Sequence, residues 1–211
     1  MSNFFVVGIV LNIVLTGLAL YWLWRQRVPK IRKNGEGRDK KNGAQSDHAG
    51  FREPDVSNDF LSSHVSLLVN SFRHWTGRDL VDSGMSPLQQ ARALHEAPFV
   101  VASHGTETDP VFNYANRAAL ALFEAGWNDF TSTPSRLSAE PMEREERAQL
   151  LERVKRQGFT DDYSGIRLSA TGRRFHIQRA TVWNVMDAHG KPSGQAVLIH
   201  EWEYLSPLER S

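Results

Sequence analysis

The period of the hydrophobic pattern changes near Gly158, and this change constrains the fold more than any other feature of the chain. In the charged segment before Gly158, apolar residues recur at helical spacing, which predicts an amphipathic helix over 141–158. Four residues are expected to face inward from it: Met142, Ala148, Leu151 and Val154. After Gly158, apolar and polar residues alternate, which predicts three antiparallel strands. The longest of them is expected to carry four apolar residues on one face: Phe175, Ile177, Trp183 and Val185.

Helices and two further strands are predicted upstream of this change. A helix is expected from Asn58 to Gly77, and a second begins at Ser86, where a capping box precedes Pro87 at the first helical position. A short strand follows at Pro98–Ser103. These elements together predict an α+β domain whose helices pack on one face of an antiparallel sheet.

The stretch Pro110–Trp127 passes from strand to helix within a few residues. β-forming residues come first, Asn116 then stands where a helix N-cap would lie, and Gly126 stands where the helix would end. The stretch therefore predicts a strand that runs directly into a helix.

A run of 21 uncharged residues, Phe4–Trp24, lies near the N-terminus. This is the length of about 20 residues that a transmembrane helix needs. Between Arg25 and Lys41 there are eight Lys and Arg residues against two Asp and Glu. The positive-inside rule therefore predicts a single-pass membrane protein with its N-terminus outside and the remainder in the cytoplasm. The alternative, a cleaved signal peptide, would carry its basic residues before the apolar run rather than after it.

Three segments follow from this pattern. We predict a transmembrane anchor over 1–25, a basic flexible linker over 26–55 that has few apolar residues, and a globular domain over 56–205.

Composition excludes several classes of function. The chain has no cysteine, so it holds no disulfide, no thiolate-bound zinc and no flavin adduct on sulfur. A formal net charge of +1 gives no overall attraction for nucleic acid, and no nucleic-acid partner is expected. The eight histidines show no metal-binding spacing, so no metal site is predicted.

The soluble part resembles the MEKHLA domain, a branch of the PAS fold. The resemblance is carried by "HVSLLVNSFRHWTGRDLV", "FNYANRAALALFE" and "PSRLSAEP", and above all by the segment from Gly158 to Trp183. It implies a PAS-like sheet, with Asn116 at the corner where the second strand meets its helix, and a sensory or interaction role. It implies no enzyme activity and no particular cofactor. The MEKHLA domain also occurs in plant homeodomain–leucine-zipper regulators, but the chain shows neither a homeodomain nor heptads.

One set of residues is predicted to bind a ligand. Alternation along the strand would direct Arg179 into the core, where it would bind an anion with Thr181 as a second donor. The predicted set is completed by three apolar walls and the corner residue: Trp183, Phe112, Phe123 and Asn116. The alternative places Arg179 at the edge or open face of the sheet with its charge in water.

Other polar residues are predicted to be structural. Asp161 and Asp162 precede a strand, and a capped turn is favoured over a cation site. Basic residues are expected to bridge these acids: Arg136, Arg167, Arg173 and Arg174. His176 and His200 would be candidates for a haem ligand, although a lone strand histidine is more often a packed or surface residue. No catalytic residue is predicted, and acid–base chemistry by Tyr163, His176 or Asp187 stays an alternative.

The predicted function is that of a membrane-tethered PAS-like sensory module, without catalysis, which binds a small molecule or mediates signalling interactions. A protein–protein adaptor with a filled core is the main alternative. The expected partners are the lipid bilayer, through Phe4–Trp24, and a second copy or an unidentified protein at the open face of the sheet. A sensor requires an internal cavity, whereas an adaptor requires only an exposed apolar patch.

Overall fold

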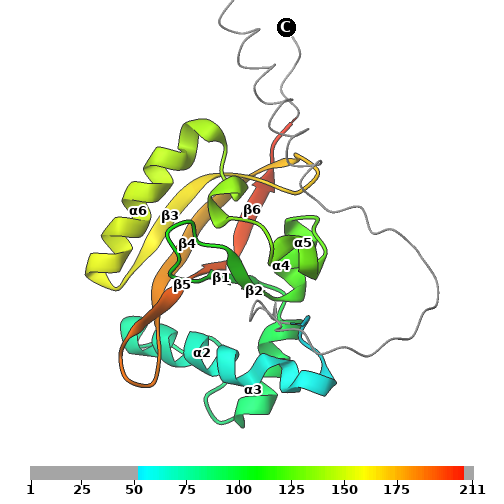
Figure 1. Ribbon diagram of the computed structural model, residues 1–211, viewed down its shortest axis with the longest axis vertical. Coiled ribbons are helices and arrows are strands. Elements are labelled where there is room, and N and C mark those ends of the chain that lie inside the picture. The colour runs from blue at the N-terminus through cyan, green and yellow to red at the C-terminus, as the bar shows by residue number, and fades with distance from the viewer. Residues whose placement is uncertain (1–51, 207–211) are drawn as a thin grey trace, which may run out of the picture. The chain divides into compact units, whose positions relative to one another are not determined.

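The computed structural model describes residues 52–206 of the chain, which form a six-stranded antiparallel sheet with helices around it (Figure 1). The predicted anchor at Phe4–Trp24 and nearly all of the predicted linker lie outside the described residues. Between residues 52 and 206, no helix combines the length and the apolar character that crossing a bilayer requires.

The sheet has the order β2-β1-β5-β4-β3, and β6 pairs with the first half of β4. The strands are β1 (Val100–His104), β2 (Phe112–Ala115), β3 (Phe159–Leu168), β4 (Arg174–Met186), β5 (Pro192–Ile199) and β6 (Glu201–Tyr204). The first strands of the chain thus join the sheet beside β5, and β4 lies between β5 and β3. The change to strand periodicity after Gly158 is confirmed, with a short additional strand at the C-terminal end.

The helical elements are η1 (Val56–Leu61), α2 (Ser62–Thr76), α3 (Pro87–Glu96), α4 (Arg117–Leu122), α5 (Trp127–Phe130), η2 (Ser135–Ser138), η3 (Pro141–Glu143) and α6 (Arg144–Gln157). The predicted capping box at Ser86 is present, with Gln89 as its reciprocal partner. The helix after Asn116 is shorter than predicted, because α4 ends at Leu122 and Gly126 instead caps the next short helix.

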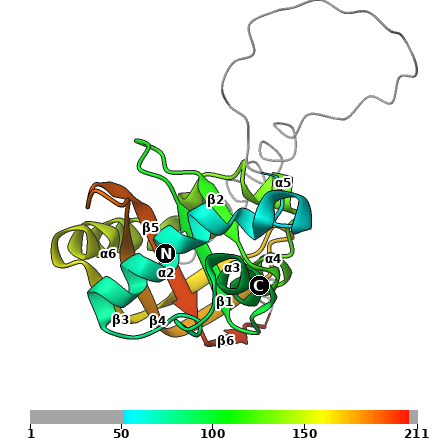
Figure 2. The same cartoon turned by 90° about the horizontal axis from the view of Figure 1, so that it is seen from below.

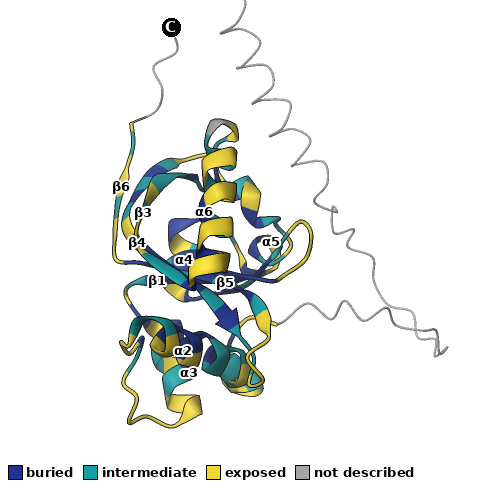
Figure 3. Cartoon of the chain, turned by 90° about the vertical axis from the view of Figure 1, so that its left-hand side faces the viewer, coloured by how far each residue is buried: buried dark blue, intermediate teal, exposed yellow. Residues whose placement is uncertain are grey.

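Of the residues predicted to face inward from helix α6, Val154 is buried and Leu151 is partly buried in the same cluster. Leu150 and Val154 are buried against Val182 of β4, whereas Ala148 is exposed. Figure 3 shows the outward side of α6 exposed and the strands behind it largely buried. The amphipathic character was predicted correctly, but Leu150 takes part in the buried stripe and Ala148 does not.

Helices cover both faces of the sheet, which corrects the prediction that they pack on one. On one face, α2 runs across the strands (Figure 2) and Phe72 packs edge-on against Trp183 at 5.0 Å between ring centroids. On the other face, α6 packs on β4, and Phe123 at the end of α4 packs against Phe175 at 5.2 Å. We call these the α2 face and the α6 face. Helices are needed on both faces because the strands carry buried side chains on both faces. In β1, for example, every residue is buried.

A bulge at Arg179 reverses the side-chain alternation of β4. Arg179 has a φ of +45°, and the pairing with β3 moves three residues along β4, from Ala180 to Ile177, while it moves two along β3. One extra residue in a strand sends every later side chain to the opposite face. Phe175 and Ile177 therefore point to the α6 face.

The residues beyond the bulge point the other way. Trp183 contacts Phe72 of α2, and Val182 is the residue that contacts α6. The prediction that Phe175, Ile177, Trp183 and Val185 share one face is wrong for this reason. The regular alternation of the sequence gives no sign of an inserted residue.

Candidate functional site

A cavity of about 60 Å³ lies on the α6 face, between α6 and the strands β1, β3, β4 and β5. At 10–15 Å³ per enclosed water, it has room for roughly four or more water-sized groups. Most of its wall is apolar, with Phe112, Phe123 and Ile177 among the contributing side chains. Three basic side chains also line it, and they come from three different elements: His104, Arg147 and Arg167. The cavity is far below the 300–1,000 Å³ of a pocket for a drug-sized ligand, so it suits a small molecule.

Arg167 reaches the cavity from the end of β3. Its side chain is buried, with only 4% of the residue exposed. The guanidinium lies over the ring of Tyr163 at 5.1 Å and donates one hydrogen bond of 2.7 Å from Nη1 to the carbonyl oxygen of Ile166. Gly165 makes this arrangement possible, because a Cβ there would lie 2.7 Å from the Tyr163 hydroxyl oxygen.

Arg147 reaches the cavity from the first turns of α6. Its Nη2 atom donates a hydrogen bond of 3.0 Å to the hydroxyl oxygen of Ser135, which is itself fully buried in η2. This contact directs the side chain beneath the helix, although α6 presents most of its other charged residues to solvent (Figure 3). An amphipathic helix generally keeps its charged residues on the solvated face, and Arg147 departs from this rule.

The third basic side chain of the cavity wall is His104, the last residue of β1. Its Nδ1 atom lies 2.8 Å from the carbonyl oxygen of Gly105, which can only accept, so Nδ1 carries the proton. Burial is the main effect on the pKa of His104 and lowers it. The charge of Arg147 also lowers this pKa, whereas the hydrogen bond to Gly105 raises it. The ring is therefore neutral at pH 7 and its Nε2 atom holds a lone pair. Within the described residues, Nε2 is buried and has no hydrogen-bond partner.

The cavity wall has an uncompensated positive charge. Burial lowers the pKa of Arg167 to about 9, helped by the charge of Arg147 and opposed by that of Glu143. Burial likewise lowers the pKa of Arg147 to about 10. Both remain charged at pH 7. Within residues 52–206, neither guanidinium forms an ion pair with a carboxylate.

Glu143 is the acidic residue whose charge opposes the lowering of the Arg167 pKa. Its Oε2 atom accepts a hydrogen bond of 3.0 Å from the backbone N–H of Ile166, so the carboxylate is engaged by the backbone of β3. The prediction that Arg136, Arg167, Arg173 and Arg174 bridge Asp161 and Asp162 is wrong. Asp161 pairs with Arg78 instead, and three of the four arginines pair with other acids: Arg136 with Asp109, Arg173 with Glu124 and Arg174 with Glu140.

The structure brings two of the six predicted ligand-binding residues to this cavity. Phe112 and Phe123 form part of its wall. Their role in binding stays a prediction. The other four lie elsewhere, and the bulge in β4 accounts for three of them: Arg179, Thr181 and Trp183.

Arg179 is exposed at the bulge, where its Nη2 atom lies 3.3 Å from the carboxylate of Glu201 on β6. This matches the alternative that placed its charge in water. Thr181 and Trp183 are buried, but they face α2 instead of α6. Among the described residues, the arginines that line the cavity are Arg147 and Arg167.

Asn116 has no hydrogen-bonding capacity left for a ligand. It is completely buried, and its Oδ1 atom accepts from the backbone N–H groups of Val101 and Ala119, at 3.0 Å each. Its Nδ2 atom donates to the carbonyl oxygens of Leu94 and Phe99, at 3.2 and 2.7 Å. The predicted N-cap is confirmed, and the same side chain ties the end of α3 and the strand β1 to the start of α4.

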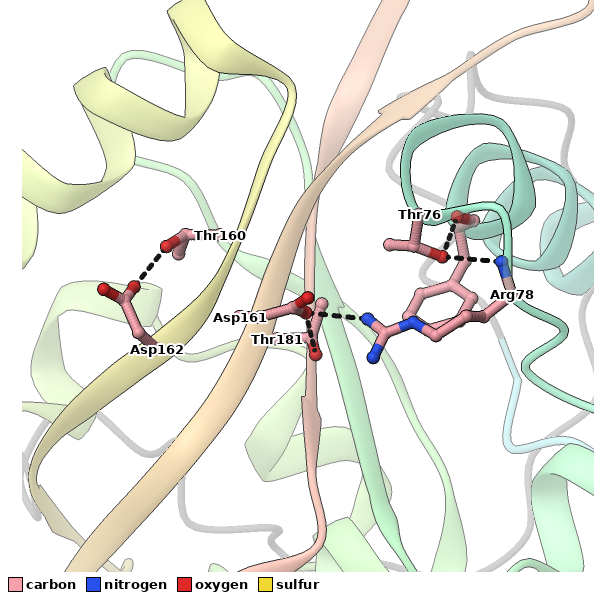
Figure 4. A network of polar contacts seen from close by, with 7 residues as sticks. Thr76, Arg78, Thr160, Asp161, Asp162 and Thr181 are labelled. Atoms are coloured by element: carbon pink, nitrogen blue, oxygen red, sulfur yellow. Dashed lines mark hydrogen bonds and ion pairs between the residues drawn. The ribbon is translucent and has the colours of Figure 1, made fainter.

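Asp161 and Asp162 point to opposite sides of β3, as Figure 4 shows. Asp161 accepts hydrogen bonds from Thr181 at 2.8 Å and from Arg78, which follows α2, at 2.7 Å, while Asp162 is hydrogen-bonded to Thr160. Both acids lie within β3, so the predicted turn ahead of a strand is wrong, and Asp161 instead connects β3 to β4 and to the residue after the α2 cap. No three His, Asp or Glu side chains in the described part of the chain are grouped closely enough to hold a metal ion.

A second hollow of about 150 Å³ lies on the α2 face, bordered by Arg78, Asp79 and His200 among others. Its charged residues are paired, Arg78 with Asp161 and Asp79 with Arg73. It therefore lacks the unneutralised charge of the cavity on the α6 face. His176 and His200, the haem candidates, do not line that cavity.

Comparison with known proteins gives a family, a plant relative and several solved structures. The MEKHLA domain family matches residues 62–204. The homeobox-leucine zipper protein ATHB-9 of Arabidopsis thaliana is 25% identical over 146 residues, which is 67% of this chain and 17% of that protein. The chain thus spans less than a fifth of the length of that relative.

Among solved structures, a PAS domain from Colwellia psychrerythraea matches 54% of this chain and 93% of its own, with a TM-score of 0.46 at 14% identity. A light-oxygen-voltage domain matches 56% of this chain and 85% of its own, with a TM-score of 0.44 at 14% identity.

Proposed function

Because the chain belongs to the MEKHLA domain family, we propose that its domain is a sensory module that binds a small molecule in the cavity on the α6 face. The family match over residues 62–204 confirms the resemblance found in the sequence, and the domain is α+β with a PAS-like antiparallel sheet. Binding would be communicated by signalling interactions of the same domain. No catalytic step is part of this proposal.

The observation that carries the proposal is a cavity whose wall contains unsatisfied polar groups. Buried polar and charged groups are normally paired, because leaving them unpaired costs free energy. Arg147 and Arg167 lack carboxylate partners and Nε2 of His104 lacks any partner in the part of the chain described. An adaptor with a filled core has no need of such groups, whereas a binding site for a polar ligand does.

The alternative of an acid–base enzyme is supported less well by the geometry. Tyr163 lines the cavity, but Asp187 accepts backbone hydrogen bonds from His189 and Lys191 in the loop between β4 and β5. His176 lies beside Glu203 of β6 in the sheet. The three candidates do not converge on one position, as a general acid and base must.

We propose a partner surface that covers only part of the sheet, and not a whole open face of it as the sequence predicted. Helix α2 covers the second half of β4, where Phe72 packs against Trp183, and reaches β1, where Nε2 of His64 lies 3.1 Å from the hydroxyl oxygen of Ser103. The first half of β4 keeps partly exposed residues on this side, Arg174, His176 and Gln178, next to β6. A second copy of the chain or another protein would contact this end of the sheet.

We further propose that Phe4–Trp24 tethers the module to a membrane, with the domain in the cytoplasm. The uncharged run and the basic residues that follow it support this topology. A reporter that is active only in the cytoplasm, fused after Ser211, tests it. Activity of that reporter is expected, and activity only of a reporter that works outside the cytoplasm would overturn the orientation.

Native mass spectrometry of the full chain, purified from its own cells, tests the sensory proposal. We expect a bound small molecule that is lost on denaturation. The comparison variant is Leu151→Trp, which places a bulky indole ring at a partly exposed position of the cavity wall. This variant should be purified without the bound molecule. A wild-type chain that carries no small molecule would favour the adaptor.

A further inference from the structure

We infer that the cavity on the α6 face binds a small carboxylic acid, whose carboxylate lies between Arg147 and Arg167 and whose apolar body lies against Phe112 and Phe123. This inference rests on the proposed sensory function and names the chemical class of its ligand.

The hydrogen-bond inventory leaves most of the arginine donors available. Each guanidinium has five N–H donors. In the described structure each forms one side-chain hydrogen bond, and both acceptors are neutral: the Ile166 carbonyl oxygen for Arg167 and the Ser135 hydroxyl for Arg147. Planar guanidinium groups bind carboxylates in a bidentate manner, which uses the remaining donors in pairs.

The charge balance requires an anion rather than a neutral ligand. Arg147 and Arg167 are close enough for the charge of one to lower the pKa of the other. Two like charges in a poorly hydrated site destabilise each other, and an anion between them removes that repulsion and part of the cost of burial. Glu143 offsets this charge only partly, because its carboxylate is held by the backbone of Ile166.

The other wall residues favour a carboxylate over a phosphate. Phosphate has oxygens in a tetrahedral arrangement, and each of them needs donors when it is buried. Besides the two arginines, the wall includes His104, whose neutral ring offers a lone pair at Nε2 and would repel a phosphate oxygen. The hydroxyls of Ser103 and Ser138, also in the wall, donate within the protein, to Asn113 and to the carbonyl oxygen of Ser135. The remaining wall is mainly Phe, Leu, Ile and Val, which suits the hydrocarbon part of an organic acid.

The size of the cavity limits the length of the acid. A volume of about 60 Å³ accommodates a few heavy atoms beyond those of a carboxylate. Propionate and isobutyrate fit this description, whereas a long-chain fatty acid would have to open the space between α6 and the sheet.

Calorimetric titration of the full chain in lipid nanodiscs tests the inference. The probes are propionate, isobutyrate and benzoate, the neutral amides of the same acids, and inorganic phosphate. We expect at least one acid to bind with a Kd below about 1 mM, and its amide to bind at least tenfold more weakly, since the amide carries no charge for the arginines to neutralise. Phosphate should bind more weakly than that acid.

Variants identify the site. Arg147→Gln and Arg167→Met should each weaken binding of that acid at least tenfold. Arg179→Gln is the matched control, because Arg179 lies outside the cavity and pairs with Glu201 at the surface. Its affinity for the acid should remain within twofold of the wild type. If Arg167→Met fails to fold, Arg147→Gln and the comparison of acid with amide still test whether the acid binds at the arginines.

Four outcomes would overturn the inference. They are an amide that binds as well as its acid, phosphate that binds better than every acid, an acid whose affinity survives Arg147→Gln, and no binding by any of the three acids. Native mass spectrometry separates these failures from failure of the sensory function. A neutral molecule that is bound by the wild type and lost from Leu151→Trp would reject the carboxylate and leave the sensor in place.

Discussion

Arg147 of α6 and Arg167 of β3 line the same cavity, and the positive charge of Arg147 lowers the pKa of the Arg167 guanidinium. The two residues are 20 positions apart in the chain and lie on opposite sides of the Gly158 turn. No carboxylate in the described part of the protein forms an ion pair with either of them. This relationship connects the fold to the proposed function, because it leaves a buried positive site that an anion would neutralise.

Arg167→Met is expected to stabilise the ligand-free protein. Replacing a buried, unpaired charge by an apolar side chain of similar length is often neutral or favourable, and we expect the free energy of unfolding to rise by about 1 kcal/mol. Urea unfolding of the full chain, followed by near-UV circular dichroism, measures the change.

The matched control for that variant is Arg174→Met. Arg174 is also partly buried but is paired with Glu140, so its removal leaves a carboxylate without a partner. We expect it to lose about 1–3 kcal/mol. A loss for Arg167→Met as large as that for Arg174→Met would show that Arg167 supports the fold and would weaken the case for a ligand site.

Asn116→Ala is expected to be among the most destabilising substitutions in the domain. It would leave the backbone groups of Leu94, Phe99, Val101 and Ala119 without the partner that the side chain provides. Loss of the helix cap and of several buried hydrogen bonds predicts a decrease of at least about 3 kcal/mol in the free energy of unfolding.

Asn113→Ala provides the comparison for Asn116. Asn113 is only partly buried and accepts a single hydrogen bond, from Ser103, so a loss of about 1 kcal/mol is expected. Equal losses at the two positions, measured by urea unfolding, would contradict the role of Asn116 as the joint between α3, β1 and α4.

Arg179→Gly is expected to stabilise the bulge in β4. A φ of +45° is unfavourable for a residue with a Cβ, by roughly 1–2 kcal/mol, and glycine adopts it freely. The lost ion pair with Glu201 is exposed and contributes little. Thermal unfolding should show a higher Tm for Arg179→Gly and a lower one for Arg179→Val.

The neighbouring position tests whether these effects belong to the bulge. Gln178 lies in the same strand and has no positive φ. Gln178→Val should therefore change the Tm much less than Arg179→Val does. Similar decreases at both positions would argue against a bulge at Arg179.

The stability of the domain is expected to fall between pH 6.5 and pH 4 because of His64. Burial lowers the pKa of His64 from 6.5 to about 4 in the folded protein. The unfolded chain therefore binds a proton in this window that the folded chain does not, so the stability conferred by neutral His64 is fully present above pH 6.5 and lost as the pH falls toward 4.

Chemical unfolding at several pH values checks this prediction. His64→Gln should make the dependence on pH shallower between pH 6.5 and pH 4. His74→Gln, at an exposed position of the same helix, should leave it unchanged. Parallel pH profiles for the wild type and His64→Gln would contradict the assignment.

The sequence predicts local structure well where a few neighbouring residues determine it. The capping box at Ser86, the N-cap at Asn116 and the alternating strands after Gly158 are all present. Each depends on residues within one or two turns of helix or one strand. The family resemblance is confirmed for the same reason, since it was recognised from contiguous motifs.

The cavity with Arg147 and Arg167 in its wall was not predicted, because it depends on contacts between distant segments. The bulge at Arg179 inserts one residue and reverses the faces of Thr181 and Trp183, although the pattern on either side of it looks regular. Arg147 resembles a solvent-facing residue of a charged helix, and only its contact with Ser135 places it beneath α6. The alternation around Arg167 is also misleading, because the apolar residues Ile166 and Leu168 are only partly buried whereas Arg167 between them is buried.

Carbon-13 NMR of carboxyl-labelled isobutyrate bound to the full chain in nanodiscs tests the central claim most directly. The carboxyl resonance reports the protonation of the bound acid as the pH is lowered. If the carboxylate lies between Arg147 and Arg167, its pKa should be lower when bound than in free solution, and Arg147→Gln should reduce this difference. A bound carboxyl whose pKa is raised, as burial against apolar side chains alone would cause, would contradict the account.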